Sequence, residues 1–104
     1  VYTVPTGLYV QIPYDYELQV RSRSGLVKKR DVCVANAPGT IDSDYRGEVK
    51  VLLKNNGICS YTVNRRERIA QGVVAPILRV DMEIVDRLGD TVRGSGRFGS
   101  TGGY

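Results

Sequence analysis

Apolar and polar residues alternate in short runs that end at turn-forming residues, and this pattern constrains the fold more than any other feature of the chain. Apolar side chains occupy every second position from 8 to 12, and Pro13 ends that run. The same alternation returns at 16–21. Because successive side chains of a strand point to opposite faces, a period of two predicts half-buried strands. We expect one strand at 8–12 and another at 16–21, joined as a hairpin.

The rest of the chain continues in the same manner, with strand-like runs separated by turn signals such as Asn55-Asn56-Gly57. Its 104 residues suffice for one small domain, and its 12 glycines and 4 prolines suit turns between strands. We therefore predict an all-β domain with one short helix that starts near Ser24. The further strands are predicted at 32–36, 49–53, 61–63, 69–74 and 76–85, with a polar linker at 86–91.

Two residue types limit the available chemistry. The chain has no histidine, which excludes a His general base, a Ser-His triad and a His-ligated metal site. Cys33 and Cys59 form no Cys-x-x-Cys motif, so we expect free, buried thiols in a reducing compartment. Any general base must therefore be a carboxylate, and any metal must be bound by oxygen.

The net charge of +4 suits a phosphate-bearing ligand. It is weak support for nucleic-acid binding, because the basic runs at 28–30 and 65–66 are short and read as solvated loops. The sequence contains no transmembrane run and no signal-like segment, so no membrane partner is expected. Its first residue is Val rather than Met, and we expect a processed, cropped or fragmentary chain.

The stretch from Asn36 to Glu48 joins the predicted strands 32–36 and 49–53 in a hairpin and carries more chemistry than a turn requires. It holds Asp42, Asp44 and Tyr45 within four positions, whereas a plain turn would favour Asn-Gly or Asp-Gly. Spacing alone leaves two interpretations open, a solvated polar turn or a functional site.

Three other segments carry candidate ligand-binding groups, each with a simpler alternative. Arg23, Ser24 and Gly25 at a helix start could bind an oxyanion, or form a plain cap beside a surface Arg. Gln71 by itself is an ordinary strand amide. Residues 93–104 have the composition of a flexible tail. However, their glycines and hydroxyls could also contact phosphates while Phe98 stacks on a base.

Taken together and in this order, residues 23–26, 39–48, 68–71 and 93–104 resemble four motifs of the trimeric dUTP diphosphatases (dUTPases). The resemblance spans nearly the whole chain. It implies a jelly-roll-like β domain that assembles as a homotrimer with shared active sites. It also divides the chain into a β core at 1–92 and a nucleotide-closing arm at 93–104.

The chain departs from the family pattern at Asp31, Arg66 and Arg97, where relatives usually carry Gly. The first family motif, an Ala-Gly-x-Asp-Leu type segment, would lie upstream of Val1. We expect either an intact member that lacks its N-terminal part here or an aberrant short one.

The resemblance implies Mg²⁺-assisted hydrolysis of dUTP to dUMP and pyrophosphate, which keeps uracil out of DNA. Asp42 would be the catalytic base, and Mg²⁺ would be held by the triphosphate and water rather than by side chains. Tyr45 would exclude a 2′-hydroxyl, while Asp44 and Glu48 would be structural. The other implied contacts are Asn36, Thr40, Ile41 and Lys50 with uracil, Arg23, Ser24, Gly25 and Gln71 with phosphates, and Arg93, Phe98, Gly99, Ser100 and Thr101 from the arm.

Two alternatives remain. The absence of the first motif would fit an inactive or regulatory dUTP-binding module. A dCTP deaminase of the same superfamily needs a glutamate base near the pyrimidine C4 position, and no matching Glu-bearing motif occurs. For the enzyme we expect an intracellular location, in the cytoplasm or nucleus.

Overall fold

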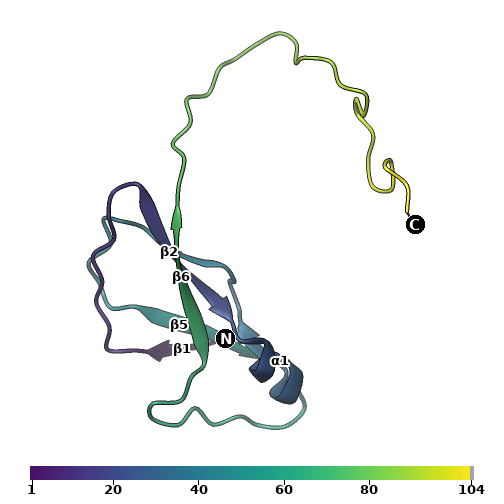
Figure 1. Ribbon diagram of the computed structural model, residues 1–104. Helices are drawn as coiled ribbons and strands as arrows, with labels where there is room; N and C mark the ends of the chain where they lie inside the picture. Colours follow the sequence, from purple (N-terminus) through teal and green to yellow (C-terminus); the bar gives the residue numbers. More distant parts are fainter. Residues whose placement is uncertain (104) are drawn as a thin grey trace.

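The computed structural model describes residues 1–103, and that range contains six β-strands and one short helix (Figure 1). The elements are β1 (Tyr2–Pro5), β2 (Tyr16–Ser22), α1 (Ser24–Arg30), β3 (Val32–Val34), β4 (Gly39–Ile41), β5 (Lys50–Asn55) and β6 (Ala70–Pro76). The strands form two antiparallel sheets, ordered β1–β5–β3 and β4–β2–β6. The predicted all-β class and the short helix are therefore confirmed.

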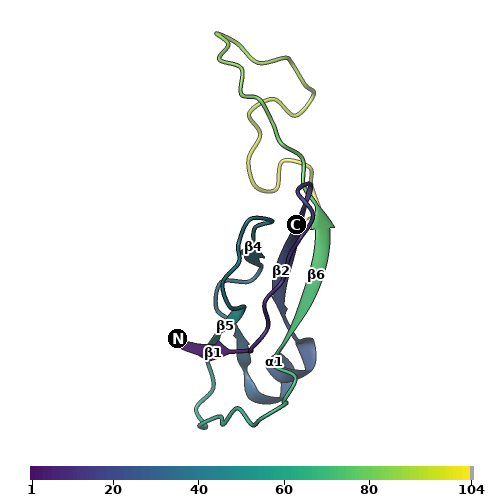
Figure 2. The ribbon, with the colours of Figure 1, turned by 90° about the vertical axis from the view of Figure 1, so that its left-hand side faces the viewer.

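The hydrophobic core lies between the two sheets, which Figure 2 shows as two layers. It consists of aliphatic side chains, mostly β-branched, which fit the pleated surface of a strand. Along β5 the buried side chains alternate with more exposed ones, as the predicted period requires. The buried residues are Val4, Val20, Val32, Val34, Val49, Val51, Leu53 and Ile69.

The predicted strand at 8–12 and its hairpin with 16–21 are wrong. Strand β2 pairs with β6 along its whole length, from Tyr16 opposite Pro76 to Ser22 opposite Ala70. Its other edge pairs with β4. Because both edges of β2 are occupied, no edge remains there for residues 8–12, which form part of an irregular connection between β1 and β2.

The hairpin between β3 and β5 is confirmed, with Val34 opposite Leu53. Its long connection is not only a loop, however, because it contains β4. After β3 the chain leaves the β1–β5–β3 sheet, and the three-residue strand β4 pairs with β2 in the other sheet, with Ile41 opposite Leu18. The connection therefore links the two layers before it reaches Asp42.

Of the remaining strand predictions, two are wrong and one is confirmed. The segment 61–63 forms no strand, although Tyr61 and Val63 pack against the core and so produce the alternation. The predicted strand at 69–74 is confirmed as β6. Of the predicted strand at 76–85, only Pro76 is paired, and residues 77–85 continue without a ladder.

Two turns adopt a left-handed backbone at residues other than glycine. Asp31 ends α1 with φ 55° and ψ 38°, and its N–H donates to the carbonyl of Val27. Arg66 has φ 65° in the turn between Asn64 and Glu67. These are two of the positions at which the resemblance predicts Gly. The turns therefore keep a conformation that suits glycine, although larger residues occupy them.

The C-terminal segment, green to yellow in Figure 1, extends away from the sheets beyond β6. The radius of gyration is 19.0 Å, whereas a compact chain of this length would have about 13 Å.

Cys33 is half-buried and Cys59 is exposed, and both are free, so the expectation of a buried thiol is wrong for Cys59.

Candidate functional site

Asp42 is the first residue after β4, and its side chain is exposed. The carbonyl of Asp42 accepts a hydrogen bond from the N–H of Tyr45 at 3.1 Å, which closes a turn. Arg46 Nη1 donates to the carbonyl of Ser43 at 2.7 Å and holds the same turn from outside. Within residues 1–103, no donor hydrogen-bonds the Asp42 carboxylate. This carboxylate can therefore accept a proton from a ligand or from water.

Tyr45 is held in place by its neighbours. Its hydroxyl donates to the carbonyl of Glu48 at 2.8 Å, and its ring lies against Gly47. The Glu48 carboxylate accepts the N–H of Gly7 at 3.0 Å, which ties the loop to the β1–β2 connection. The role of Glu48 seen here agrees with the structural one predicted for it. Tyr45 remains 43% exposed, so part of its surface can contact a ligand.

The residues predicted to contact a base lie around this loop. The Asn36 amide packs against Gly39, where an added Cβ would lie 3.2 Å from its nitrogen. Thr40 and Ile41 lie on β4 and pair with Gln19 and Leu18. Lys50 is the first residue of β5, and its side chain is exposed. The peptide bond between Ala37 and Pro38 is cis.

The residues predicted to bind phosphates lie at the other end of β2. Ser24 is the first residue of α1, and Arg23 caps the helix without a side-chain hydrogen bond. Arg23 Nη1 donates to the carbonyl of Arg68 at 2.7 Å. Gln71 Nε2 donates to the carbonyl of Ser22 at 3.0 Å, and this leaves its Oε1 available. Residues 23–25 and Gln71 are thus brought together through the end of β2.

A hollow of about 670 Å³ opens beside this group, between α1 and residues 60–68. Arg23, Gly25 and Arg68 line part of it. On its wall the Tyr61 hydroxyl donates to Glu67 at 2.5 Å. This hydrogen bond, with a second from the N–H of Asn64, lowers the pKa of Glu67 below its usual value. Burial, and then the bond to Glu67, raise the pKa of Tyr61.

The structure does not bring the base and phosphate groups together within one chain. Extending the β2–β4 register by one residue places Asp42 opposite Glu17. Arg23 lies six residues further along the same line, from 17 to 23, or roughly 20 Å at the rise of a strand. The two predicted groups therefore lie at opposite ends of β2.

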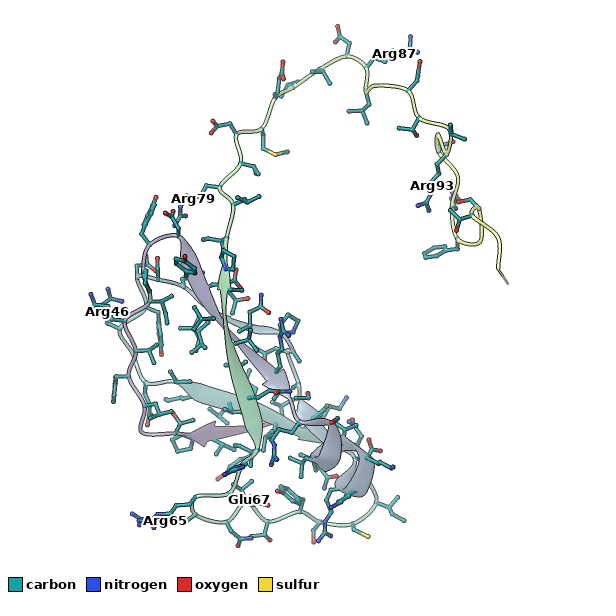
Figure 3. All side chains as sticks on the ribbon, in the orientation of Figure 1. Arg46, Arg65, Glu67, Arg79, Arg87 and Arg93 are labelled. Carbon is teal, nitrogen blue, oxygen red and sulfur yellow. The ribbon has the colours of Figure 1, made fainter. Side chains whose placement is uncertain are left out.

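The described part of the predicted arm, residues 93–103, lies apart from both groups (Figure 3). It forms consecutive turns, in which the N–H of Ser100 donates to the carbonyl of Arg97 at 2.9 Å. Gly99 has φ 78° within that turn, a value that favours glycine. Phe98 is fully exposed at 101%. Arg93 Nε donates to the carbonyl of Gly96 at 2.9 Å. Thr101 lies in the next turn, in which the N–H of Gly102 donates to the carbonyl of Gly99 at 3.0 Å. Tyr104 lies outside the described residues.

Sequence reasoning missed two residues around these groups. Ser22 Oγ accepts the N–H of Val34 at 2.9 Å, which ties β2 to β3 next to the predicted phosphate ligands. The proximity of Ser22 to the Arg-Ser-Gly segment was the available signal. Arg79 stacks on Tyr14, and no local pattern indicates a partner so distant in sequence.

Residues 1–103 contain no cluster of three or more Cys, Asp or Glu side chains that could hold a metal ion. In the same range, no helix is both long and apolar enough to cross a membrane.

Comparison with known proteins gives consistent results. A dUTPase family model matches residues 1–102. The deoxyuridine 5′-triphosphate nucleotidohydrolase of Gloeothece citriformis (strain PCC 7424) is 54% identical over 99 residues, which cover 95% of this chain and 68% of that protein.

Two solved phage proteins share the fold. The dUTPase of Staphylococcus bacteriophage 80alpha, with dUpNHpp bound, has a TM-score of 0.73 at 23% identity, covering 97% of this chain and 80% of that one. A mutant dUTPase from phage phi11 of S. aureus, described with a structural Mg(II) ion, has a TM-score of 0.66 at 20% identity, covering 86% and 79%.

Proposed function

The chain belongs to the dUTPase family, and on that premise we propose that it hydrolyses dUTP to dUMP and pyrophosphate. The observation that carries the proposal is the Asp42–Tyr45 turn. It presents a carboxylate without a hydrogen-bond donor in residues 1–103 beside a tyrosine ring whose orientation is set by Glu48 and Gly47. This arrangement can supply a proton acceptor and a sugar-contacting surface from one loop.

Asp42 acts as the general base. It accepts a proton from a water molecule whose oxygen forms a bond to the α-phosphorus. The bond between the α-phosphorus and the α–β bridging oxygen breaks, and pyrophosphate leaves with that electron pair. With no histidine in the chain, a carboxylate is the available acceptor for this proton near neutral pH.

Tyr45 selects the sugar. Its ring packs on the deoxyribose and leaves no room for a 2′-hydroxyl, which disfavours UTP. The uracil edge pairs with Asn36 and with the backbone of Thr40, Ile41 and the region near Lys50. A strand end can do this because backbone N–H and C=O groups provide donors and acceptors at fixed spacing.

The triphosphate is bound by Arg23, Ser24, Gly25 and Gln71. Gln71 already has its Nε2 tied to Ser22, so its orientation is set before the ligand binds. Arg93, Ser100 and Thr101 of the arm contact the far end of the triphosphate. Phe98 stacks on uracil, and Gly99 allows the turn that presents it.

Magnesium fits the site as an ion that is carried by the triphosphate of the substrate. It prefers oxygen ligands and retains several waters, so triphosphate oxygens suit it. When bound, it neutralises part of the triphosphate charge. The protein's own part is to hold the phosphates through Arg23, Gln71 and the arm, and to take the proton at Asp42.

We further propose that the chain works as a homotrimer with shared sites. The separation of roughly 20 Å along β2 between Asp42 and Arg23 supports this, because one nucleotide then needs groups from two copies. The small core supports it as well, since a chain of this size gains stability from surface buried in an assembly.

Product analysis with dUTP, dCTP and UTP tests the proposal. The expected result is dUMP and pyrophosphate from dUTP, with far slower turnover of UTP and no ammonia from dCTP. Ammonia released from dCTP would indicate a deaminase instead. Calorimetric binding of dUpNHpp without any turnover of dUTP would indicate a binding module. Sedimentation equilibrium at the assay concentration measures the number of copies.

A further inference from the structure

Arg79 lies where the C-terminal segment leaves the sheets, near the turn that precedes β2 (Figure 3). Its guanidinium carbon is 3.9 Å from the centroid of the Tyr14 ring, and its Nη2 donates to the Tyr14 carbonyl at 2.8 Å. Two residues earlier, the N–H of Ile77 donates to the carbonyl of Asp15 at 2.9 Å. The contact between Arg79 and Tyr14 joins residues that are 65 positions apart in the sequence.

Beyond Arg79, the described chain has no further attachment to the sheets by hydrogen bonds or ion pairs. Each hydrogen bond of residues 80–103 stays within that segment, as between Arg87 and Asp90 or between Ser100 and Arg97. Apolar side chains in the segment are exposed, including Met82 and Ile84. Arg79 is therefore the last anchor before the arm.

We propose that Arg79 is a positioning residue for the nucleotide-closing arm, setting the place and direction in which the arm leaves the sheets. The inference rests on the proposed function of residues 93–104. The carbonyl of Tyr14 and its ring hold the same guanidinium from two sides. A planar guanidinium stacks on an aromatic face and donates in its own plane, which a lysine ammonium cannot reproduce.

The direction in which the arm leaves the sheets matters more here than the length of the flexible link between the anchor and Phe98. Without Arg79, the flexible link to Phe98 would start at Ile77 and grow from 19 to 21 residues. An effective concentration that falls as the −3/2 power of length would then change by only about 15%. A measurable effect must therefore come from alignment of the chain immediately beyond the anchor, at residues 80–85.

The test compares Arg79→Ala and Arg79→Lys with the parent, and uses Arg87→Ala as the matched control. Arg87 is also a tail arginine, but its partner Asp90 lies within the tail. Nitrogen-15 relaxation of the ligand-free protein measures the order of amides 77–85. Calorimetry measures binding of dUpNHpp, and thermal unfolding checks that the core is intact.

In Arg79→Ala, we expect order parameters at 79–81 to fall below about 0.6 and analogue binding to weaken roughly three- to fivefold. Arg79→Lys should restore part of both, and Arg87→Ala should change neither. Tyr14→Ala should reproduce the effect, and the double variant should add little to it, because both residues act through one contact.

Unchanged order parameters in Arg79→Ala would overturn the inference, as would unchanged affinity or an equal loss in Arg87→Ala. Failure of the proposed hydrolysis appears separately. If the parent binds dUpNHpp but does not hydrolyse dUTP, the proposed hydrolysis fails. Comparison of the variants with the parent in affinity and order parameters would still test the role of Arg79. If the parent bound no analogue, the proposed function would fail, and the relaxation data would decide the anchor alone.

Discussion

The ring of Tyr45 lies so close to Gly47 that a side chain at position 47 has no space. A Cβ there would lie 2.6 Å from Cζ of Tyr45 and 2.9 Å from its Cε1, distances that real contacts of this kind do not show. The Tyr45 hydroxyl also donates to the carbonyl of Glu48. The absence of a side chain at 47 and this hydrogen bond together orient the ring.

Gly47→Ala should therefore displace Tyr45 and weaken sugar discrimination. We expect the ratio of kcat/KM for dUTP to that for UTP to fall roughly tenfold, since steric rejection of one hydroxyl is worth about 100-fold at most. Tyr45→Ala should lower the ratio at least as far. Gly89→Ala is the control, because a Cβ at Gly89 meets nothing within 4 Å. A ratio within twofold of the parent in both site variants would mean that Tyr45 does not select the sugar.

Asp42→Asn should abolish turnover and leave binding largely intact. The amide keeps the shape of the carboxylate but cannot accept the proton, and loss of a general base typically costs about 10²- to 10⁴-fold in rate. Asp44→Asn changes the neighbouring exposed carboxylate in the same way and should retain activity. Single-turnover rates, with calorimetric affinity for dUpNHpp, separate chemistry from binding. An Asp42→Asn rate within a few-fold of the parent would refute the base assignment.

Truncation after Val92 should reduce turnover strongly without unfolding the sheets. Residues 93–103 make no hydrogen bond to residues 1–90, so removal of the arm costs the core little. Ordering the glycine-rich arm costs roughly 1–2 kcal/mol per residue, which only contacts with the nucleotide could offset. We therefore expect the arm to be mobile without ligand and protected from proteolysis by dUpNHpp. Loss of the cooperative unfolding transition, or a parental dUTPase rate, would contradict its role as a lid.

Arg66→Gly should raise the free energy of unfolding by about 1 kcal/mol. A left-handed residue with a side chain costs about 1–2 kcal/mol, and the added chain entropy of glycine cancels part of that gain. Asp31→Gly should stabilise less, because Asp tolerates this conformation better than Arg does. Arg65→Gly, next to the strained position, has no such strain to relieve and should destabilise. Urea unfolding measures all three, and equal effects at 65 and 66 would exclude backbone strain as the cause.

The hydrogen bond between Tyr61 and Glu67 should make stability depend on pH in two windows. Hydrogen bonding lowers the folded-state pKa of Glu67 below its ordinary 4.5, so its contribution is complete above that value and is lost as the pH falls through the folded-state pKa. The Tyr61 pKa is raised above 10.0, so its contribution is complete below that value and is lost as the pH rises through the folded-state pKa.

The stability difference between the parent and Glu67→Gln should accordingly be larger at pH 7 than at pH 3. The difference between the parent and Tyr61→Phe should shrink at strongly alkaline pH. Urea midpoints at each pH provide the measurement. Differences that do not vary with pH would show that this hydrogen bond is not linked to protonation.

The sequence by itself determined the class of the fold and limited the candidate chemistry of the site. Alternation at 16–21 and 49–53 identified the central strands β2 and β5, because a half-buried strand imposes that period on its own residues. The absence of histidine left carboxylates such as Asp42 as the candidate base. The resemblance predicted Gly-type turns at Asp31 and Arg66, and both residues have the left-handed backbone that such turns use.

Only the tertiary structure decided which strand edges pair and which groups meet. Residues 8–12 alternate as well as β2 does, yet β4 and β6 already occupy both edges of β2. The placement of Asp42 and Arg23 at opposite ends of β2, and of Arg79 on Tyr14, also follows from pairing between distant segments. Periodicity reports how each residue is buried, whereas pairing depends on which edges and surfaces are free in three dimensions.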